Sequence, residues 1–310
     1  MNKLISFIIP SYNEEKNISL LYKSIMSIIR KNNYNYEIIF IDDGSMDNTF
    51  NELLNLNKND KNICIIKFKR NFGQTAAWNA GFRTAKGDLI ITMDADLQND
   101  PSDIPRLIEK LNQGYDVVSG WRFTRQDSLV KKLFSRIANI IRKLITNEKI
   151  HDAGCALKIY RKECLKDLYL YGEMHRYITT ILSLKGYKVG EVKVNHSTRK
   201  FGKTKYNAKR LLKGLLDLLF IKFWNDFSAR PLHFFGMLSF IQFILAFLIL
   251  VEQIIKAIFV IGKLDIGPLL LFSGILMISG LLTFSIGFLA EIMIRTYYKD
   301  KESYVIERII

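Results

Sequence analysis

Three oxygen-bearing side chains, Asp94, Asp96 and Gln98, follow directly on an apolar run over residues 89–93. Alternate residues at the end of a strand point the same way, so this spacing lets the three side chains face one ligand. Carboxylate and amide oxygens suit Mg²⁺ or Mn²⁺, which commonly bind the phosphates of a second ligand. A plain turn needs only one Asp or Asn. The spacing therefore predicts a site for Mg²⁺ or Mn²⁺ together with a phosphate-bearing ligand.

Two further polar clusters, at residues 42–47 and 10–15, also follow apolar runs. The carboxylates of the first cluster can accept hydrogen bonds from ribose hydroxyls or from a base, and Gly44 permits a tight turn. Two local interpretations remain open. An Asp-Gly pair is common in turns, and Ser11 or Asn13 is suited to capping a following helix.

Positive charge is concentrated in two segments of the chain. The 310 residues carry a formal net charge of +15, with a sequence pI ≈ 9.6. Residues 122–143 and 185–230 have net charges of +6 and +9, which account for the whole excess. Such segments near a membrane anchor indicate an anionic partner, either lipid headgroups or a phosphorylated ligand. Nucleic acid is the competing interpretation of this pI, but the sequence contains no nucleic-acid-binding motif.

The elements that must position these residues alternate along the first 120 residues. Apolar runs predict strands at residues 4–10, 37–42, 63–68, 88–94 and 116–120, and helical periodicity marks residues 14–30, 49–57, 74–85 and 103–113. This order predicts an α/β domain with a mostly parallel sheet covered by helices on both faces. Ligands bind beyond the carboxyl ends of the strands in such sheets, where the three polar clusters fall.

Two long apolar runs follow the α/β pattern. Residues 234–251 contain 18 positions without a charge and residues 266–290 contain 25, and each run is long enough to cross a bilayer as a helix. The basic flanks place both chain ends in the cytoplasm, and the first residues do not resemble a signal peptide. Residues 209–227 form a basic amphipathic helix, which either lies in the headgroup plane or packs on the domain core.

Together these features predict four regions. They are a cytoplasmic domain over residues 1–200, juxtamembrane amphipathic helices over 201–230, a transmembrane hairpin over 231–295 with spans at about 234–256 and 266–291, and a cytoplasmic tail over 296–310. The three cysteines form no CxxC motif, which argues against a disulfide framework or a zinc site.

In order and spacing, four motifs resemble the family 2 inverting glycosyltransferases of GT-A fold. They are Pro-Ser-Tyr-Asn-Glu at 10–14, Asp-Asp-Gly-Ser-x-Asp at 42–47, Asn-Phe-Gly-Gln at 71–74 and Asp-Ala-Asp at 94–96. Each motif is common, but the combination is specific. Residues 120–122, 151–158 and 170–175 and the hairpin extend the resemblance, over essentially the whole chain, to the polyprenyl-phosphate branch. That branch contains dolichol-phosphate mannose synthases and bacterial undecaprenyl-phosphate hexosyltransferases.

The resemblance implies a GT-A domain over residues 1–200 and a role for each matching residue. Asp94, Asp96 and Gln98 would hold the metal and the nucleotide diphosphate, and Pro10, Tyr12, Glu14 and Asp43 would line the nucleoside pocket. Arg122, Arg136, Arg199 and Lys205 fall where the branch binds the acceptor phosphate, and a solvated or lipid-facing charge is the alternative for each. Asp152 is expected to act in catalysis with Arg122, by positioning a sugar hydroxyl or the arginine or by serving as a base, unless it only forms a turn. His151, His175 and His196 share no metal-binding spacing and are expected to be structural.

The resemblance implies inverting transfer of a hexose from a nucleotide sugar, UDP-glucose or a related UDP-hexose, to undecaprenyl phosphate at a bacterial inner membrane. A lipid monophosphate has a second pKa near ~6, so it is largely a dianion at neutral pH and needs little help from a base. The alternatives are a GDP-mannose-dependent synthase, a processive polysaccharide synthase, and a catalytically silent scaffold or flippase partner. The second normally carries Gln-x-x-Arg-Trp, which is absent here, and intact Asp94, Asp96 and Arg122 argue against the third. The resemblance also implies a homo-oligomer, a tetramer being favoured.

Overall fold

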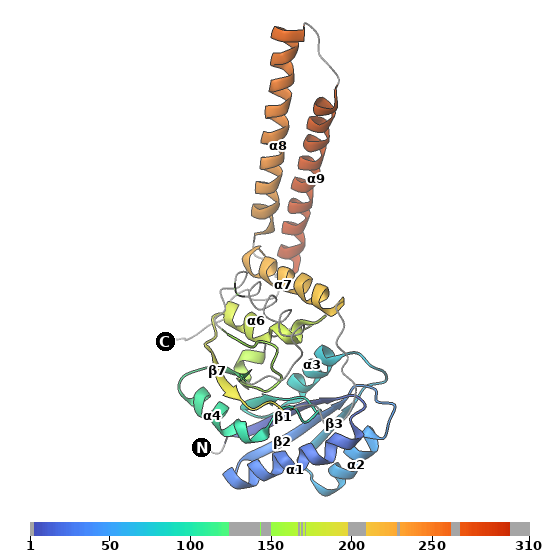
Figure 1. Ribbon diagram of the computed structural model, residues 1–310, viewed down its shortest axis with the longest axis vertical. Coiled ribbons are helices and arrows are strands. Elements are labelled where there is room, and N and C mark those ends of the chain that lie inside the picture. Colours follow the sequence, from blue (N-terminus) through green and yellow to red (C-terminus); the bar gives the residue numbers. More distant parts are fainter. Residues whose placement is uncertain are drawn as a thin grey trace. The chain divides into compact units, whose positions relative to one another are not determined.

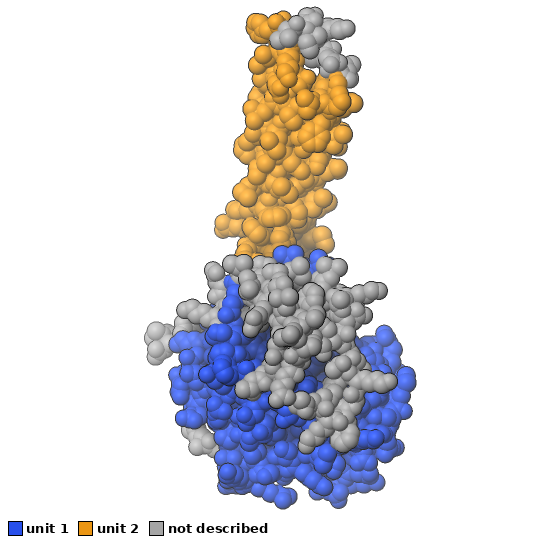
Figure 2. Space-filling view, in the orientation of Figure 1, with its two compact units in different colours: residues 1–221 blue, residues 222–310 orange. Residues whose placement is uncertain are grey.

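The computed structural model describes residues 3–123, 143, 150–166, 168, 170, 172–197, 209–227, 230–261 and 267–297. The chain divides into two compact units, residues 1–221 and residues 222–310 (Figures 1 and 2). Each unit is described below by itself. The four regions expected from the sequence, with their boundaries, stay a prediction.

A seven-stranded sheet, counted over the described residues, is the frame of the first unit (Figure 1). Its strands are β1 (Leu4–Ser11), β2 (Asn35–Asp42), β3 (Ile63–Lys67), β4 (Leu89–Thr92), β5 (Val117–Arg122), β6 (Lys158–Arg161) and β7 (Val189–Val194). They lie in the order β3-β2-β1-β4-β6-β5-β7, and only β6 runs antiparallel to its neighbours β4 and β5. The predicted α/β fold with a mostly parallel sheet is confirmed.

Helices cover both faces of this sheet. The described helices of the unit are α1 (Glu15–Asn32), α2 (Thr49–Asn59), α3 (Gln74–Thr84), α4 (Ile104–Asn112) and α6 (Ile178–Leu184), with short 3-10 turns at Pro101–Asp103, Lys162–Leu165 and Met174–Tyr177. Side chains of α1, α2 and α4 share one buried cluster with the sheet, and side chains of α3 and α6 share the other. The sheet therefore lies between two helical layers, as strand–helix alternation predicts.

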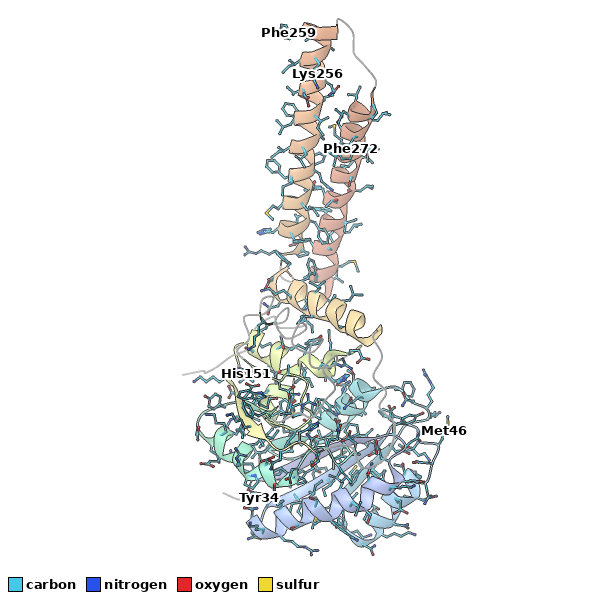
Figure 3. The ribbon with its side chains drawn as sticks, viewed as in Figure 1. Tyr34, Met46, His151, Lys256, Phe259 and Phe272 are labelled. Carbon is cyan, nitrogen blue, oxygen red and sulfur yellow. The ribbon has the colours of Figure 1, made fainter. Side chains whose placement is uncertain are left out.

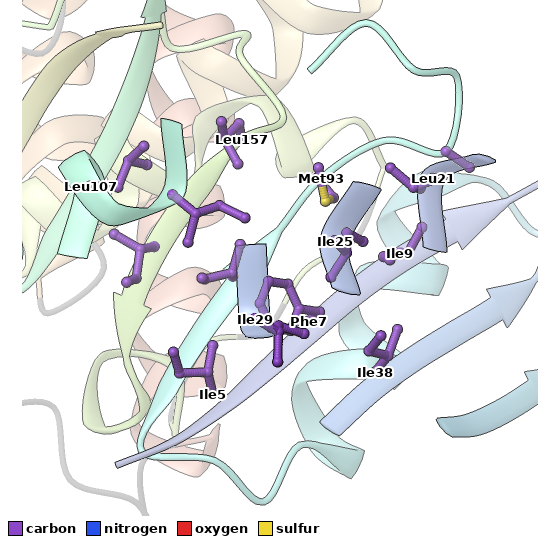
Figure 4. Packing of buried hydrophobic residues seen from close by; sticks show 14 of the residues in the cluster. Ile5, Phe7, Ile9, Leu21, Ile25, Ile29, Ile38, Met93, Leu107 and Leu157 are labelled. Carbon is purple, nitrogen blue, oxygen red and sulfur yellow. The ribbon is translucent and has the colours of Figure 1, made fainter. Parts of the chain in front are cut away.

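Successive side chains of β1 point to opposite faces of the sheet, so this one strand packs against both helical layers. Phe7 and Ile9 join the cluster under α1, whereas Ile8 between them joins the cluster under α3. On α1, Ile25 and Ile29 lie one turn apart and face Phe7 (Figure 4). Burying each such side chain favours folding by about 1.5–3 kcal/mol. This packing holds α1 against β1, so the first turn of α1 has a fixed position next to the end of that strand.

Two long apolar helices make up most of the second unit. They are α8 (Pro231–Lys256), continued by a short π-helical segment at Ala257–Ile261, and α9 (Pro268–Tyr297). Segments Pro231–Phe259 and Pro268–Ile294 are long and apolar enough to cross a membrane, and only 11% of the most apolar window of each is buried. Their placement in a bilayer, and the cytoplasmic orientation, stay predictions.

The two helices pack closely because small residues lie between them. The Ser239 hydroxyl of α8 donates to the Gly280 carbonyl of α9 at 2.8 Å. A Cβ atom at Gly287 would lie only 2.6 Å from the Cβ of Phe235. Close approach at small residues is the usual way apolar helices associate in lipid, where burial of apolar surface gives no driving force.

Helix α7 (Lys209–Phe227) coincides with the amphipathic segment expected from the sequence. Leu218 and Ile221 are buried, and Ile221 belongs to the cluster under α3, so part of the helix packs on the domain core. Leu216, Leu219 and Phe220 remain exposed. The two interpretations of this helix are therefore compatible, and its contact with lipid headgroups stays a prediction.

Candidate active site

The connections after β1 and β2 are joined to each other at the carboxyl edge of the sheet. The backbone N–H of Asn13 donates to Oγ of Ser45 at 3.0 Å, and Oδ1 of Asn13 accepts from the N–H of Met46 at 2.9 Å. Asn13 reaches these partners because its φ is 57°. Helix α1 begins after Glu14 without a side-chain cap, so the helix-cap interpretation of Asn13 is wrong.

Asp43 ties in a third segment, the stretch before α3. Its two carboxylate oxygens accept from the N–H groups of Phe72 at 2.7 Å and Gly73 at 2.9 Å. Close approach of the two segments requires Gly44, whose φ is +71° and whose Cβ position lies 2.4 Å from the carbonyl carbon of Arg70. The three connections therefore form one hydrogen-bonded rim around the predicted nucleoside pocket.

Two buried oxygens on this rim have no hydrogen-bond partner among the described residues. They are Oγ of Ser11 and Oδ2 of Asp42, which are register partners at the ends of β1 and β2. Unpaired buried polar atoms are costly, and a bound polar ligand or water removes that cost. The pocket-lining roles of Pro10, which lies in β1, and of Tyr12 and Glu14 in the connection stay predictions.

The segment with the predicted metal ligands is a turn rather than the end of a strand. β4 ends at Thr92, and Leu97 adopts a φ of 60°, which reverses the chain before Gln98. The expected alternation of side chains on a continuing strand is therefore wrong. Their convergence depends instead on the turn between residues 94 and 98.

The donor atoms in this turn nevertheless fit a hard divalent cation. Asp96 is 4% exposed, and its Oδ1 accepts from the N–H of Gln98 at 3.2 Å. Oδ1 of Asp94 accepts from the side-chain amide of Gln74 at 2.6 Å. Over the part of the chain that is described, no group of three or more His, Cys, Asp or Glu is placed to hold a metal. The predicted site would therefore rely on two carboxylates and the Gln98 amide as its donors. The roles of Asp94, Asp96 and Gln98 stay predictions.

Arg122, at the end of β5, and Asp152 form a bidentate ion pair. Nε of Arg122 donates to Oδ2 of Asp152 at 2.7 Å and Nη2 donates to Oδ1 at 2.9 Å, with both side chains 14% exposed. Burial alone lowers the pKa of Arg122, but the hydrogen bonds and charge of Asp152 more than offset this, and Asp94 adds to the upward shift. The arginine is therefore permanently charged and lies within electrostatic range of the predicted metal-binding carboxylate.

The loop that carries Asp152 is held by residues absent from the predicted site. Glu191 of β7 accepts from the backbone N–H groups of His151 at 2.7 Å and Asp152 at 2.9 Å. Lys158 of β6, which is 1% exposed, donates to the carbonyls of Ala153 and Cys155. The sequence holds one hint of each residue. Glu191 is a rare acid within the strongly basic segment 185–230, and Lys158 is the last residue of the motif at 151–158.

Contacts of two histidines are described, and the structural role expected of the histidines stays a prediction. The ring of His151 meets Glu191 at 2.8 Å and stacks on Trp121 with centroids 4.3 Å apart (His151 in Figure 3). Nδ1 of buried His175 lies 2.6 Å from the hydroxyl of Thr75.

Three predicted acceptor-site cations, Arg136, Arg199 and Lys205, lie outside the described residues. A separate cavity of about 720 Å³ lies at the opposite, amino-terminal edge of the sheet, where Lys3, Asp88 and Arg161 are among its lining residues. None of the predicted site residues lines this cavity. The carboxyl edge is therefore the candidate active site.

Comparison with known proteins agrees with this fold. Residues 6–169 match the family model described as glycosyl transferase family 2. The chain is 39% identical to the dodecaprenyl-phosphate galacturonate synthase of Rhizobium johnstonii, over 98% of this chain and 92% of that protein. It is 33% identical to the undecaprenyl-phosphate 4-deoxy-4-formamido-L-arabinose transferase of Photorhabdus laumondii, over 99% of this chain and 94% of that protein.

A solved structure supports the fold. The glucosyl-3-phosphoglycerate synthase of Mycobacterium tuberculosis, in complex with Mn²⁺, UDP-glucose and glycerol 3-phosphate, superposes with a TM-score of 0.55. That match has 17% identity and covers 71% of this chain and 80% of the other. Sequence and fold agree, and this chain is an enzyme that belongs to the family 2 glycosyltransferases.

Proposed function

We propose that the protein transfers a hexose from a nucleotide sugar to a polyprenyl phosphate, with inversion at the anomeric carbon. UDP-glucose or a related UDP-hexose is the proposed donor and undecaprenyl phosphate the proposed acceptor. The relatives named above act, by their names, on dodecaprenyl or undecaprenyl phosphate, and they align with nearly the whole chain.

The observation that carries the proposal is the bidentate pair of Arg122 and Asp152 at the carboxyl edge of the sheet. Asp94 belongs to the turn expected to hold the donor diphosphate, and its charge acts on Arg122. Arg122 is fixed by Asp152 through Nε and Nη2, which leaves Nη1 without a hydrogen bond among the described residues. A guanidinium held in this way presents a cationic edge to a phosphate.

The proposed chemistry needs few steps. An oxygen of the lipid phosphate dianion attacks the anomeric carbon as the bond to the nucleotide β-phosphate breaks, and the nucleoside diphosphate leaves with the bonding electrons. No proton has to move, since the nucleophile is already ionised at neutral pH. Arg122 would hold the dianion close to a second anion, and the rim tied by Asp43 would orient the nucleoside. Asp152 then serves to position Arg122.

We propose a divalent metal for the leaving group. Asp94, Asp96 and Gln98 would hold Mg²⁺ or Mn²⁺, and the ion would supply positive charge that stabilises the departing diphosphate. The Mycobacterium structure with Mn²⁺ and UDP-glucose supports this by fold alone.

We also propose that α8 and α9 anchor the protein in a bacterial inner membrane with the catalytic unit on the cytoplasmic side. Exposed apolar side chains on α7 and the two basic segments would contact anionic lipid. A homo-oligomer, with a tetramer favoured by family resemblance, belongs to the same proposal.

The donor is tested by incubating purified protein in undecaprenyl-phosphate vesicles with radiolabelled nucleotide sugars. The panel contains UDP-glucose, UDP-galactose, UDP-galacturonate, UDP-4-deoxy-4-formamido-L-arabinose and GDP-mannose, and the lipid products are separated. Formation of labelled lipid from a UDP-hexose supports the proposal. If labelled lipid forms only from GDP-mannose, the protein is instead a polyprenyl-phosphate mannose synthase. A retained anomer in the product, measured by NMR, refutes direct attack by phosphate.

The same assay separates an enzyme of this specificity from a silent scaffold. Asp96→Ala removes a buried carboxylate from the proposed metal site, so we expect lipid-linked sugar formation to fall at least a hundredfold. Unchanged product formation would show that lipid transfer is not carried out at this site.

A further inference from the structure

The loop over residues 150–156 belongs to no helix or strand, so side chains of neighbouring elements have to hold its backbone. It lies directly before β6, and it carries the Asp152 carboxylate that grips Arg122. A carboxylate on such a loop holds a guanidinium in one orientation only if the loop backbone is itself fixed. The contacts of that backbone therefore matter for the reaction as well as for the fold.

An anionic side chain binds the amide side of this loop. Oε1 of Glu191 accepts from two consecutive backbone N–H groups, those of His151 at 2.7 Å and Asp152 at 2.9 Å. Oε2 meets Nδ1 of His151 at 2.8 Å, and the glutamate side chain is only 13% exposed. Three contacts from one carboxylate fix the backbone at the residue that contacts Arg122.

A cationic side chain binds the carbonyl side of the same loop. Nζ of Lys158 donates to the carbonyl oxygens of Ala153, at 3.0 Å, and Cys155. Lys158 is 1% exposed and forms no ion pair among the described residues, although the charges of Asp152 and Asp94 act on it. A buried ammonium without an ion-pair partner is an expensive way to satisfy two carbonyls, which points to a role beyond stability.

We propose that Glu191 and Lys158 are positioning residues for sugar transfer, which hold the Asp152 loop from its amide and carbonyl sides so that Asp152 orients Arg122 toward the acceptor phosphate. This inference rests on the proposed function, in which Arg122 binds that phosphate. Neither residue needs to touch substrate. Partners of this kind change activity through the residue they orient, and their loss commonly costs about 10- to 100-fold.

The chain offers a matched control for Glu191. Oε1 of Glu37 likewise accepts from two consecutive backbone N–H groups, those of Lys86 at 2.6 Å and Gly87 at 3.2 Å. These residues precede β4, at the edge of the sheet opposite the candidate active site. Glu37→Ala removes the same kind of support from a loop that carries no proposed site residue.

The experiment measures KM and kcat for undecaprenyl phosphate with full-length protein in vesicles, together with thermal unfolding. For Glu191→Ala we expect the acceptor KM to rise about tenfold or more while the donor KM changes less than about twofold. Glu191→Gln keeps an oxygen for both N–H groups and should restore most of the loss. Glu37→Ala should lower the unfolding temperature without changing the acceptor KM.

Lys158→Met and a double variant complete the test. Lys158→Met fills the same space without donors and should raise the acceptor KM as Glu191→Ala does. Because Glu191 acts through Arg122, adding Glu191→Ala to Arg122→Ala should cause no further loss of residual turnover. The inference is overturned if the losses of turnover from Glu191→Ala and Arg122→Ala are fully additive. It is also overturned if Glu191→Ala and Glu37→Ala raise the acceptor KM equally.

The two proposals fail in distinguishable ways. A raised acceptor KM in Arg122→Ala with unchanged values in Glu191→Ala and Lys158→Met overturns only the positioning role. An unchanged acceptor KM in Arg122→Ala overturns the acceptor assignment in the proposed function, and the positioning role with it. If Glu191→Ala does not fold, Lys158→Met carries the same comparison with Glu37→Ala.

Discussion

Replacing Asp152 with Asn should weaken both the fold and the reaction, because the substitution keeps the shape of the side chain and removes its charge. Oδ1 and Oδ2 of Asp152 accept from Nη2 and Nε of Arg122. In Asp152→Asn, one of these oxygens becomes an NH₂ group that faces another donor. The guanidinium then keeps one hydrogen bond and loses its counter-charge.

The size of the effect follows from how buried the pair is. Breaking a fully buried ion pair costs about 3–5 kcal/mol, and an exposed pair is worth about 0–1 kcal/mol. Both side chains are 14% exposed, so solvent screens the pair only in part, and we expect a loss of about 2 kcal/mol. For a unit of this size that corresponds to a fall in Tm of about 4–8 °C. A misplaced Arg122 should lower kcat/KM for the lipid acceptor by about 100-fold.

Thermal unfolding in detergent and kinetics in vesicles measure the two effects, and Asp116→Asn is the matched control. Asp116 lies 3.9 Å from Nε of Arg161 with side chains 32% and 26% exposed, and its Oδ2 accepts from the N–H of Lys188 at 2.8 Å. The oxygen of an Asn side chain can keep the bond to Lys188, so the substitution should cost less than about 1 kcal/mol and leave turnover intact. The reasoning is refuted if Asp152→Asn leaves Tm and kcat/KM unchanged, or if the two variants lose activity equally.

Three further predictions concern other parts of the first unit. Gly44→Ala should lower Tm strongly, because the new Cβ would lie 2.4 Å from the carbonyl carbon of Arg70 and φ at this position is +71°. Gly114→Ala is the control: its φ is +94° but no atom lies within 4 Å of the Cβ position, so it measures the cost of the backbone conformation alone. Burial and a neighbouring aspartate raise the pKa of Tyr22 from 10.0 to about 12. The unfolded chain therefore loses this proton first, so stability should fall as pH rises from about 10 toward 12, and Tyr22→Phe should reduce that fall. Burial raises the pKa of Cys155 to about 11, so mass spectrometry should find it unmodified by iodoacetamide at about pH 8 until the protein unfolds.

The sequence predicted elements well where apolar alternation was strong. The predicted strand at residues 37–42 matches β2 (Asn35–Asp42), and the helix expected at residues 74–85 matches α3 (Gln74–Thr84). The sequence did not predict β6, because the strand has only four residues and begins with Lys158. Lysine is usually exposed, whereas this one is buried. β7 lies at the sheet edge, where alternating charges such as Glu191 and Lys193 hide the strand pattern.

Within the site, residue types were more predictable than contacts. Arg122 and Asp152 were expected to act together, and the structure pairs them. The use of Asp43 to hold the backbone at Phe72 and Gly73 was not predictable, because it depends on a close approach that only the fold creates. Glu191 was hidden for the same reason, since it lies 39 residues from Asp152 and acts on backbone atoms.

The antiparallel direction of β6 explains how the two halves of the site reach one edge. Parallel strands end at the carboxyl edge, so the loop before a parallel strand lies at the opposite edge. β6 runs the other way, with its first residue, Lys158, opposite Thr92 at the end of β4. The loop before β6 therefore reaches the carboxyl edge, where Oγ1 of Thr92 donates to the Ala156 carbonyl at 2.8 Å. A parallel β6 would carry Asp152 about 13 Å away, the length of four strand residues, and out of reach of Arg122.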